Sequence, residues 1–160
     1  MNTTKTREAA AKKILKSNIR PELSVSYATE AGHMFCDGYR AVFLREYLGA
    51  FPPCPGGIGE SITRFLFQAR NNHGSSIDAP SKKELAEHIH AVNAEAKKER
   101  CRARFASLEI MPGVWCDARL LLDMLKMIDD ARIISGDKPY STLYIKGSNG
   151  EGILCPIRRG

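Results

Sequence analysis

The chain has 160 residues, a length at which a single domain buries roughly two thirds of the surface that its unfolded chain exposes. Hydrophobic residues make up 43% of it and charged residues 26%, which excludes disorder over most of its length. The formal net charge of +6 favours contact with a polyanion such as nucleic acid, although a solvated basic surface is equally compatible with it.

A predicted helix at residues 4–17 opens the chain and ends before Pro21. With about 100° between successive residues, the cations of this segment fall within one arc, whereas Ala10, Ala11 and Ile14 fall on the other side. The arc is either a solvated surface or a face that contacts phosphates. Its cationic stripe consists of Lys5, Lys12, Lys13, Lys16 and Arg20.

Three short strands are predicted after this helix. Apolar residues alternate with polar ones at 23–27, and short apolar runs follow at 33–36 and 41–44. Asp37-Gly38 is a two-residue hairpin signal between the second and third strands. We therefore expect a first unit, residues 4–46, that consists of a helix and an antiparallel meander.

Residues 47–102 are predicted to form a mainly helical insertion. Prolines and glycines between 49 and 59 indicate a loop, and a short helix is expected at 61–69. Ser81 and Glu84 have the spacing of a capping box, which starts a longer helix with a basic far end. The cations of that end are Lys97, Lys98, Arg100, Arg102 and Arg104.

The last segment, residues 103–158, is predicted to repeat the plan of the first unit. Asp117 is placed to cap a helix whose apolar stripe is the clearest in the chain. Three strands are expected after it, at 131–135, 141–146 and 152–158. The predicted core comprises Trp115 and the stripe Leu120, Leu121, Met124, Leu125 and Ile128. Residues 1–160 are thus predicted to be one α+β domain.

Two stretches of the sequence resemble the DNA sliding clamps, in particular the bacterial DNA polymerase III β-subunit. The segment Asp37-Gly38-Tyr39-Arg40-Ala41 is similar to the family's T-D-G-[HY]-R-L-A, with Cys36 in place of the usual threonine. Residues 117–125 resemble the helix N-A-[KR]-Y-L-L-D-A-L, and residues 153–158 resemble the closing strand [IL]-x-M-P-[MV]-R. The repeated unit of one helix and three strands is also the plan of these clamps, whereas residues 47–102 fit the family poorly.

The resemblance implies a DNA-clamp-like fold in which helices face double-stranded DNA and sheets form the outer wall. The cationic stripe would then be the DNA-binding face and would contact phosphates without reading bases. The resemblance also implies an apolar cleft for short partner peptides. The matching cleft residues are Gly38, Tyr39, Arg40, Pro156, Ile157 and Arg158. Since a clamp chain holds three such domains, this chain would have to form a homo-oligomer to encircle DNA.

The sequence contains no clear catalytic or metal-binding pattern. His33 and Cys36 lie three residues apart, but a strand and a turn seldom direct both side chains to one point. His88 and His90 point in different directions on a helix, and a solvated helix face accounts for the acidic residues Asp123, Asp129 and Asp130. We therefore assign no catalytic residue, no metal site and no cofactor.

Three functions follow as hypotheses. The first is a non-catalytic, DNA-associated clamp-like scaffold of the processivity type. The alternative is a small protein-interaction or regulatory domain that uses the same fold without binding DNA. A thiol-dependent enzyme that uses Cys36 ranks last.

The expected compartment is the cytoplasm. Residues 1–16 are polar and lack the apolar core of a signal peptide, and no later run has the length needed to cross a bilayer, so no membrane contact is expected. The five cysteines are scattered without C-x-x-C spacing, so we expect reduced thiols.

Overall fold

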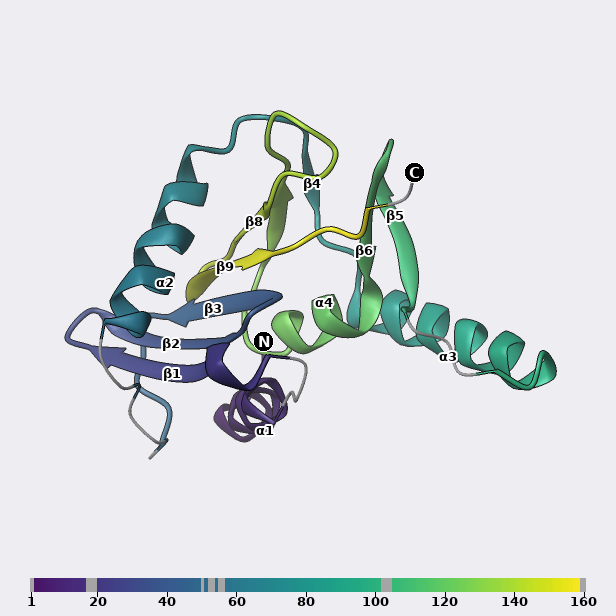
Figure 1. The fold of residues 1–160 in the computed structure, drawn as a ribbon. Helices are drawn as coiled ribbons and strands as arrows, with labels where there is room; N and C mark the ends of the chain where they lie inside the picture. Colours follow the sequence, from purple (N-terminus) through teal and green to yellow (C-terminus); the bar gives the residue numbers. More distant parts are fainter. Residues whose placement is uncertain are drawn as a thin grey trace.

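The computed structural model describes residues 2–16, 20–49, 51, 54, 57–101 and 105–158, and it shows an α+β arrangement (Figure 1). Within these residues lie four α-helices, namely α1 (Thr4–Leu15), α2 (Ile58–Gln68), α3 (Lys82–Lys98) and α4 (Ala118–Leu125). Two short 3-10 helices, η1 (Pro21–Leu23) and η2 (Ala69–Asn71), accompany them. In this described part, no helix has the length and apolar character needed to cross a membrane.

An antiparallel sheet of seven strands forms the centre of the molecule, in the order β1-β2-β3-β9-β8-β7-β4. A separate hairpin of two strands precedes α4. The strands of the sheet are β1 (Ser24–Thr29), β2 (Gly32–Asp37), β3 (Arg40–Leu44), β4 (Ser76–Asp78), β7 (Arg132–Ile134), β8 (Leu143–Lys146) and β9 (Gly150–Leu154), and those of the hairpin are β5 (Ser107–Met111) and β6 (Val114–Asp117).

A helix followed by three antiparallel strands occurs twice in this arrangement. The first set is α1 with β1, β2 and β3, and the second is α4 with β7, β8 and β9. The last strands of the two sets, β3 and β9, pair with each other from Arg40↔Leu154 to Leu44↔Gly150. One continuous sheet therefore joins the two ends of the chain.

The two faces of the sheet bury different helices because side chains alternate along each strand. Phe35, Val42 and Leu154 point to the side of α1 and α4, where the larger core lies. Met34 and Phe43 point to the opposite side, where α2 covers a smaller core. The helices α1 and α2 consequently lie on opposite sides of the strands β1 to β3 (Figure 1).

Local capping signals are confirmed. The Ser81 side chain accepts a hydrogen bond from the Glu84 backbone N–H, and the Glu84 carboxylate accepts one from Ser81, as a capping box requires. The Asp117 carboxylate accepts hydrogen bonds from the backbone N–H groups of Arg119 and Ala106, at 3.0 and 3.3 Å. Asp117 therefore both starts α4 and fixes the segment before the β5–β6 hairpin.

The first helix is shorter than the pattern predicted. It ends at Leu15 with Lys16 as its C-cap, and Arg20 has φ −138° and ψ 79°, outside the helical region. The ring of Pro21 disfavours a helical conformation in the residue before it, so Arg20 cannot continue the helix. Arg20 is therefore not part of the helical stripe, contrary to the prediction.

Three further predictions are corrected. Strand β4 lies within the expected insertion and pairs with β7. The sequence did not predict this strand, because a segment of three residues with one apolar side chain is too short to show a strand period. The closing strand ends at Leu154 instead of residue 158, since Pro156 has no backbone N–H for a ladder. Trp115 and Leu120 of the predicted core are only half-buried, whereas Leu121, Met124, Leu125 and Ile128 are buried as predicted, Ile128 beyond the end of α4.

Candidate functional site

An apolar cleft of about 240 Å³ opens between the β2–β3 hairpin, the end of β9 and α2. The hairpin supplies Gly38, Tyr39 and Ala41, the sheet supplies Ile153, and α2 supplies Ile62 and Phe65. Phe65 is 52% exposed and Tyr39 37%, so two exposed aromatic rings belong to the lining of the cleft. An apolar concavity with exposed aromatic side chains is typical of a surface that binds another molecule.

The structure brings together half of the predicted cleft residues. Gly38, Tyr39 and Arg40 line the cleft, whereas Pro156, Ile157 and Arg158 are not among its lining residues, which corrects that prediction. After β9 the chain turns toward the β5–β6 hairpin, where the Ile157 N–H donates to the Trp115 carbonyl. The Arg158 guanidinium lies 4.9 Å from the centre of the Tyr140 ring.

The wall contributed by α2 was not predicted. Ile62 and Phe65 lie three residues apart on one helix face, which is the only sequence signal that they share a surface. This spacing does not indicate which sheet face the helix covers, because that choice depends on contacts with distant strands.

The turn that carries Tyr39 is fixed by the conformation of Gly38 and by hydrogen bonds to the Asp37 side chain. Gly38 has φ +90°, a conformation that side chains rarely adopt, and the loop between the strands is Gly38-Tyr39, one residue later than predicted. One oxygen of the Asp37 carboxylate accepts hydrogen bonds from the backbone N–H groups of Tyr39 and Arg40, each at 3.0 Å. The Asp37 side chain thus closes an Asx-turn, and this turn holds the Tyr39 ring at the cleft.

Arg40 has a structural role beneath the cleft. Its side chain is 3% exposed, with Nε 3.0 Å from Asp37 and Nη1 2.9 Å from Asp123 on α4. Nη1 also donates to the Leu120 carbonyl at 3.0 Å. The charge of Arg40 is therefore already paired, so this residue holds the hairpin against α4 instead of offering a free cation to a ligand.

Two thiols, those of Cys36 and Cys155, line the same cleft. Burial raises the pKa of the Cys36 thiol to about 11 and also raises the pKa of Cys155. A raised pKa lowers the thiolate fraction at neutral pH, and the thiolate is the reactive form. This weighs against the hypothesis of a thiol-dependent enzyme at Cys36. All five cysteines are free thiols in the structure.

His33 and Cys36 do not form a joint site. His33 and Phe35 are adjacent aromatic rings on the α1 side of β2, whereas Cys36 belongs to the core on the α2 side. The His33 Nδ1 accepts a hydrogen bond from the Leu48 N–H at 3.2 Å, and burial lowers its pKa. Among the described residues, no group of three or more His, Cys, Asp or Glu side chains is placed to hold a metal ion.

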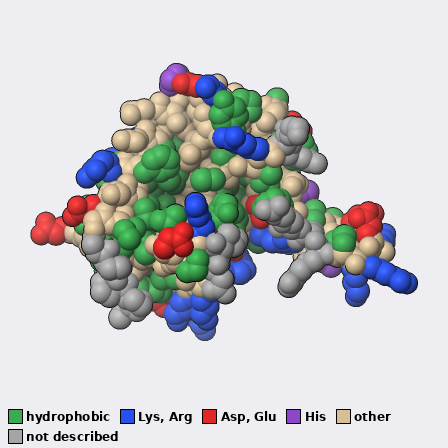
Figure 2. Space-filling view, in the orientation of Figure 1, with side chains coloured by type: hydrophobic (Ala, Val, Ile, Leu, Met, Phe, Trp, Pro, Cys, Tyr) green, Lys and Arg blue, Asp and Glu red, His purple; other side chains and the backbone are tan. Residues whose placement is uncertain are grey.

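The second candidate surface is the basic face of α1. Lys5, Lys12, Lys13 and Lys16 are exposed, and Lys and Arg side chains gather over this helix at the bottom of Figure 2. A hollow of about 370 Å³ between α1 and α4 is lined by Lys5, Lys13 and Lys126 together with Asp123. Asp123 is the only acidic residue in this lining, and its carboxylate lies 3.4 Å from the Lys13 ammonium.

The other predicted cations lie elsewhere. Arg20, off the helix, is 3.7 Å from Glu22. Lys97 and Lys98 form the last turn of α3, which extends away from the sheet (Figure 1) and ends in Lys and Arg side chains at the right of Figure 2. Arg102 and Arg104 lie outside the described residues. The basic face of α1 and α4 is therefore separate from the basic end of α3.

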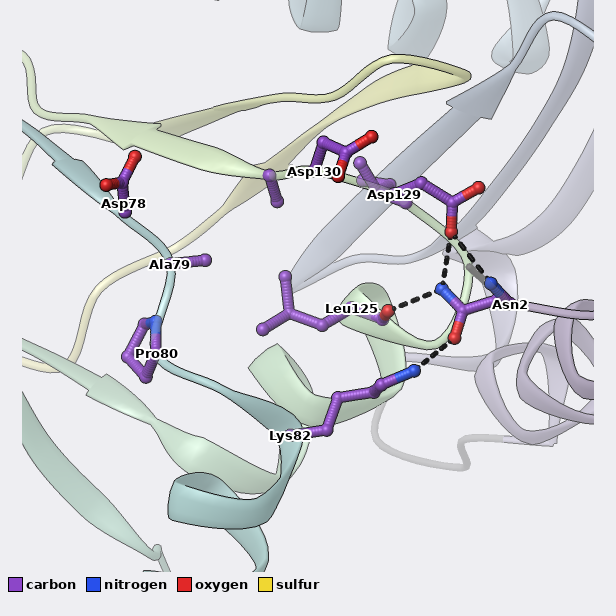
Figure 3. Close-up of a pocket in the computed structure, with 10 residues that line it drawn as sticks. Asn2, Asp78, Ala79, Pro80, Lys82, Leu125, Asp129 and Asp130 are labelled. Carbon is purple, nitrogen blue, oxygen red and sulfur yellow. Dashed lines mark hydrogen bonds between the residues drawn. The ribbon is translucent and has the colours of Figure 1, made fainter.

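An acidic hollow of about 560 Å³ lies near the start of the chain (Figure 3). Asn2 bridges it, donating to the Leu125 carbonyl and to Asp129 and accepting from Lys82. Its acidic residues already have partners: Asp129 with Arg7 at 2.6 Å, Asp78 with Arg132 at 2.6 Å, and Asp130 with Ser148 at 3.0 Å. These contacts engage each of the three carboxylates within the fold.

Comparisons of the chain with family models, with curated proteins and with solved structures find no match. The functional assignment therefore depends on the geometry of the two surfaces described above.

Proposed function

We propose that the chain is a non-catalytic clamp-like scaffold that contacts the phosphates of double-stranded DNA through α1 and α4 and holds a partner peptide in its apolar cleft. The observation that carries this proposal is the hollow between α1 and α4, where Lys5, Lys13 and Lys126 come together from two helices. Cations spaced along one helical face suit backbone contacts, which require no base-specific side chains.

The arrangement of the two surfaces supports this division of roles. The basic face lies on the side of α1 and α4, and the apolar cleft lies on the side of α2, across the sheet. A partner held in the cleft would therefore leave the basic face free for DNA. In the proposed assembly, copies associate through the sheet edges, which are β1 and β4.

The DNA contact is tested by Lys5→Gln combined with Lys12→Gln. Both side chains are exposed on α1, so their loss removes two phosphate contacts without changing the core. We expect duplex affinity to fall on the order of tenfold and the salt dependence of log K to flatten by about 1.8, or about 0.9 per contact. The measurement is fluorescence anisotropy with a short duplex over a range of salt concentrations.

A matched control removes the same charge elsewhere, through Arg64→Gln on α2 and Lys83→Gln on α3, both exposed. An equal loss of affinity in both double variants would show that DNA affinity depends only on the net charge of the protein. It would contradict the proposal that the basic face of α1 contacts DNA specifically. Light scattering on the same samples reports whether copies associate on the duplex.

The peptide cleft is tested with peptides selected on the folded protein by phage display. We expect them to be rich in apolar residues and to bind at least about tenfold more weakly to Tyr39→Ala and to Phe65→Ala, as aromatic residues at the centre of an interface commonly do. Tyr47→Ala is the control, because Tyr47 is 63% exposed and lies outside the cleft lining. Selected peptides that bind all three variants equally would place the binding site elsewhere.

A second function, protein interaction without DNA, would use the same cleft. The pairing of Lys13 with Asp123 favours it, because this contact reduces the positive potential of the basic face. Peptide binding that persists at high salt, together with duplex binding that is unchanged in the Lys5 and Lys12 variant, would favour this function over the scaffold.

A further inference from the structure

A third hollow, of about 360 Å³, lies at the turn between β8 and β9. Three cations line it: Arg45 after β3, Arg70 in η2 and Lys146 at the end of β8. Glu151 and Tyr144 form its buried floor. Neither the peptide cleft nor the basic face of α1 shares a lining residue with it.

Strand register explains why these charges meet. Lys146 pairs with Glu151 across β8 and β9, and Glu151 pairs with Phe43 across β9 and β3. Directly paired residues place their side chains on the same face, and Arg45 is two residues beyond Phe43, on that face again. The cations therefore lie on the α2 side of the sheet, opposite the basic face of α1.

The charge of the hollow is unbalanced. Glu151 is paired with Arg70 through two contacts of 2.6 and 2.8 Å and accepts from the Tyr144 hydroxyl at 3.3 Å. Within the described part of the chain, no carboxylate lies at salt-bridge distance from Arg45 or Lys146. One carboxylate against three cations leaves two positive charges uncompensated.

Two parts of the hollow are held in place before any ligand binds. Arg70 is fixed by Glu151 and by the Phe67 ring, whose centre lies 3.9 Å from its guanidinium carbon. The wall at Gly150 is backbone alone, because glycine has no side chain. A larger residue would not fit there, since its Cβ would lie 2.4 Å from the Phe43 carbonyl oxygen. Fixed donors lose less entropy on binding than mobile ones.

We propose that this hollow binds a phosphate-type oxyanion, either free or as the end group of a small molecule. Arginine presents several N–H donors in a plane that matches an oxyanion, and the lysine adds a compact charge. A volume of about 360 Å³ accommodates a small ligand of this kind. The site does not depend on the proposed DNA contact, because its residues lie on the other side of the sheet.

The test is calorimetric titration of the full chain with inorganic phosphate, pyrophosphate and ATP at low ionic strength. We expect saturable binding of one phosphate form per chain and at least about a tenfold loss of affinity in Arg45→Gln combined with Lys146→Gln, since two charge-assisted contacts are removed. The matched control is Arg64→Gln combined with Lys83→Gln, whose residues lie outside the lining. Thermal unfolding shows whether each variant remains folded.

The three ligands separate the sources of the oxyanion. Similar affinity for all three would show that a phosphate group alone is recognised, and tighter binding of ATP would show that a small molecule carries it. An absence of saturable binding for every ligand overturns the proposal, as does an equal loss in the control variant. If Arg45→Gln with Lys146→Gln does not fold, Lys146→Gln alone, at an exposed position, is used and is expected to weaken binding.

Discussion

Replacing Arg40 with alanine is expected to lower the free energy of unfolding by about 3–5 kcal/mol, the cost of removing one partner from a buried ion pair. The change leaves the carboxylates of Asp37 and Asp123 buried without the cation that contacts both of them. It also removes the donor that reaches the Leu120 carbonyl. The hairpin would then lose its main polar connection to α4. Urea denaturation, followed by circular dichroism, measures the effect.

Lys13→Ala is the control for this experiment because Lys13 contacts the same carboxylate from solvent. Its side chain is 68% exposed, so its removal is expected to change the free energy of unfolding by about 0.5 kcal/mol or less. A loss at Arg40 no greater than that at Lys13 would contradict the structural role assigned to Arg40.

Replacing Asp129 with alanine is expected to lower the free energy of unfolding by about 3 kcal/mol. Asp129 accepts from the Arg7 guanidinium at 2.6 Å and from the Asn2 backbone N–H at 3.0 Å, and it is buried with both. The remaining partner of Arg7, Glu46 at 2.6 Å, keeps the loss at the lower end of the range for a broken buried pair. Chemical denaturation at neutral pH measures this difference.

The same residue predicts a pH dependence. Burial acts to raise the pKa of Asp129, but the Asn2 N–H and the Arg7 guanidinium outweigh burial and hold that pKa below its ordinary value of 3.8. The ionised carboxylate therefore stabilises the fold above pH 3.8, and this contribution disappears as the pH falls through the lower folded-state pKa. We expect the wild type to lose more stability than Asp129→Ala between neutral pH and this acid range.

Asp78→Ala is the control for Asp129→Ala. Asp78 is also an aspartate paired with an arginine, but its side chain is 85% exposed, so a loss of at most about 1 kcal/mol is expected. Parallel acid denaturation profiles for the wild type and Asp129→Ala would contradict the assigned role of Asp129.

Features that depend on neighbouring residues were predictable from the sequence alone. The capping box at Ser81 and Glu84 and the cap at Asp117 follow from side chains that bond to their own helix ends. The first strand follows from the alternation at 23–27, and the next two follow from the short apolar runs at 33–36 and 41–44. The stripe Lys5, Lys12 and Lys13 follows from helical periodicity. Each signal is contained within a few residues, so no knowledge of the rest of the fold was needed.

Features that join distant segments were decided only by the tertiary structure. The pairing of β3 with β9 merges the two meanders into one sheet, and β4 enters that sheet through β7. Periodicity identifies a strand but does not specify its neighbour, because the neighbour depends on which packing buries the most apolar surface.

The candidate sites show the same division. The resemblance to the sliding clamps implied that Gly38, Tyr39 and Arg40 share one surface, but it did not indicate that α2 would complete the cleft. It also did not indicate that Arg40 would be buried against Asp123, a residue 83 positions away. By itself the sequence therefore determined the helices, most of the strands and the cationic stripe of this protein. Tertiary packing decided which side chains meet in a cleft and which form buried ion pairs. The physical reason is that a buried charge without a partner carries a large desolvation free energy, so buried charges are paired.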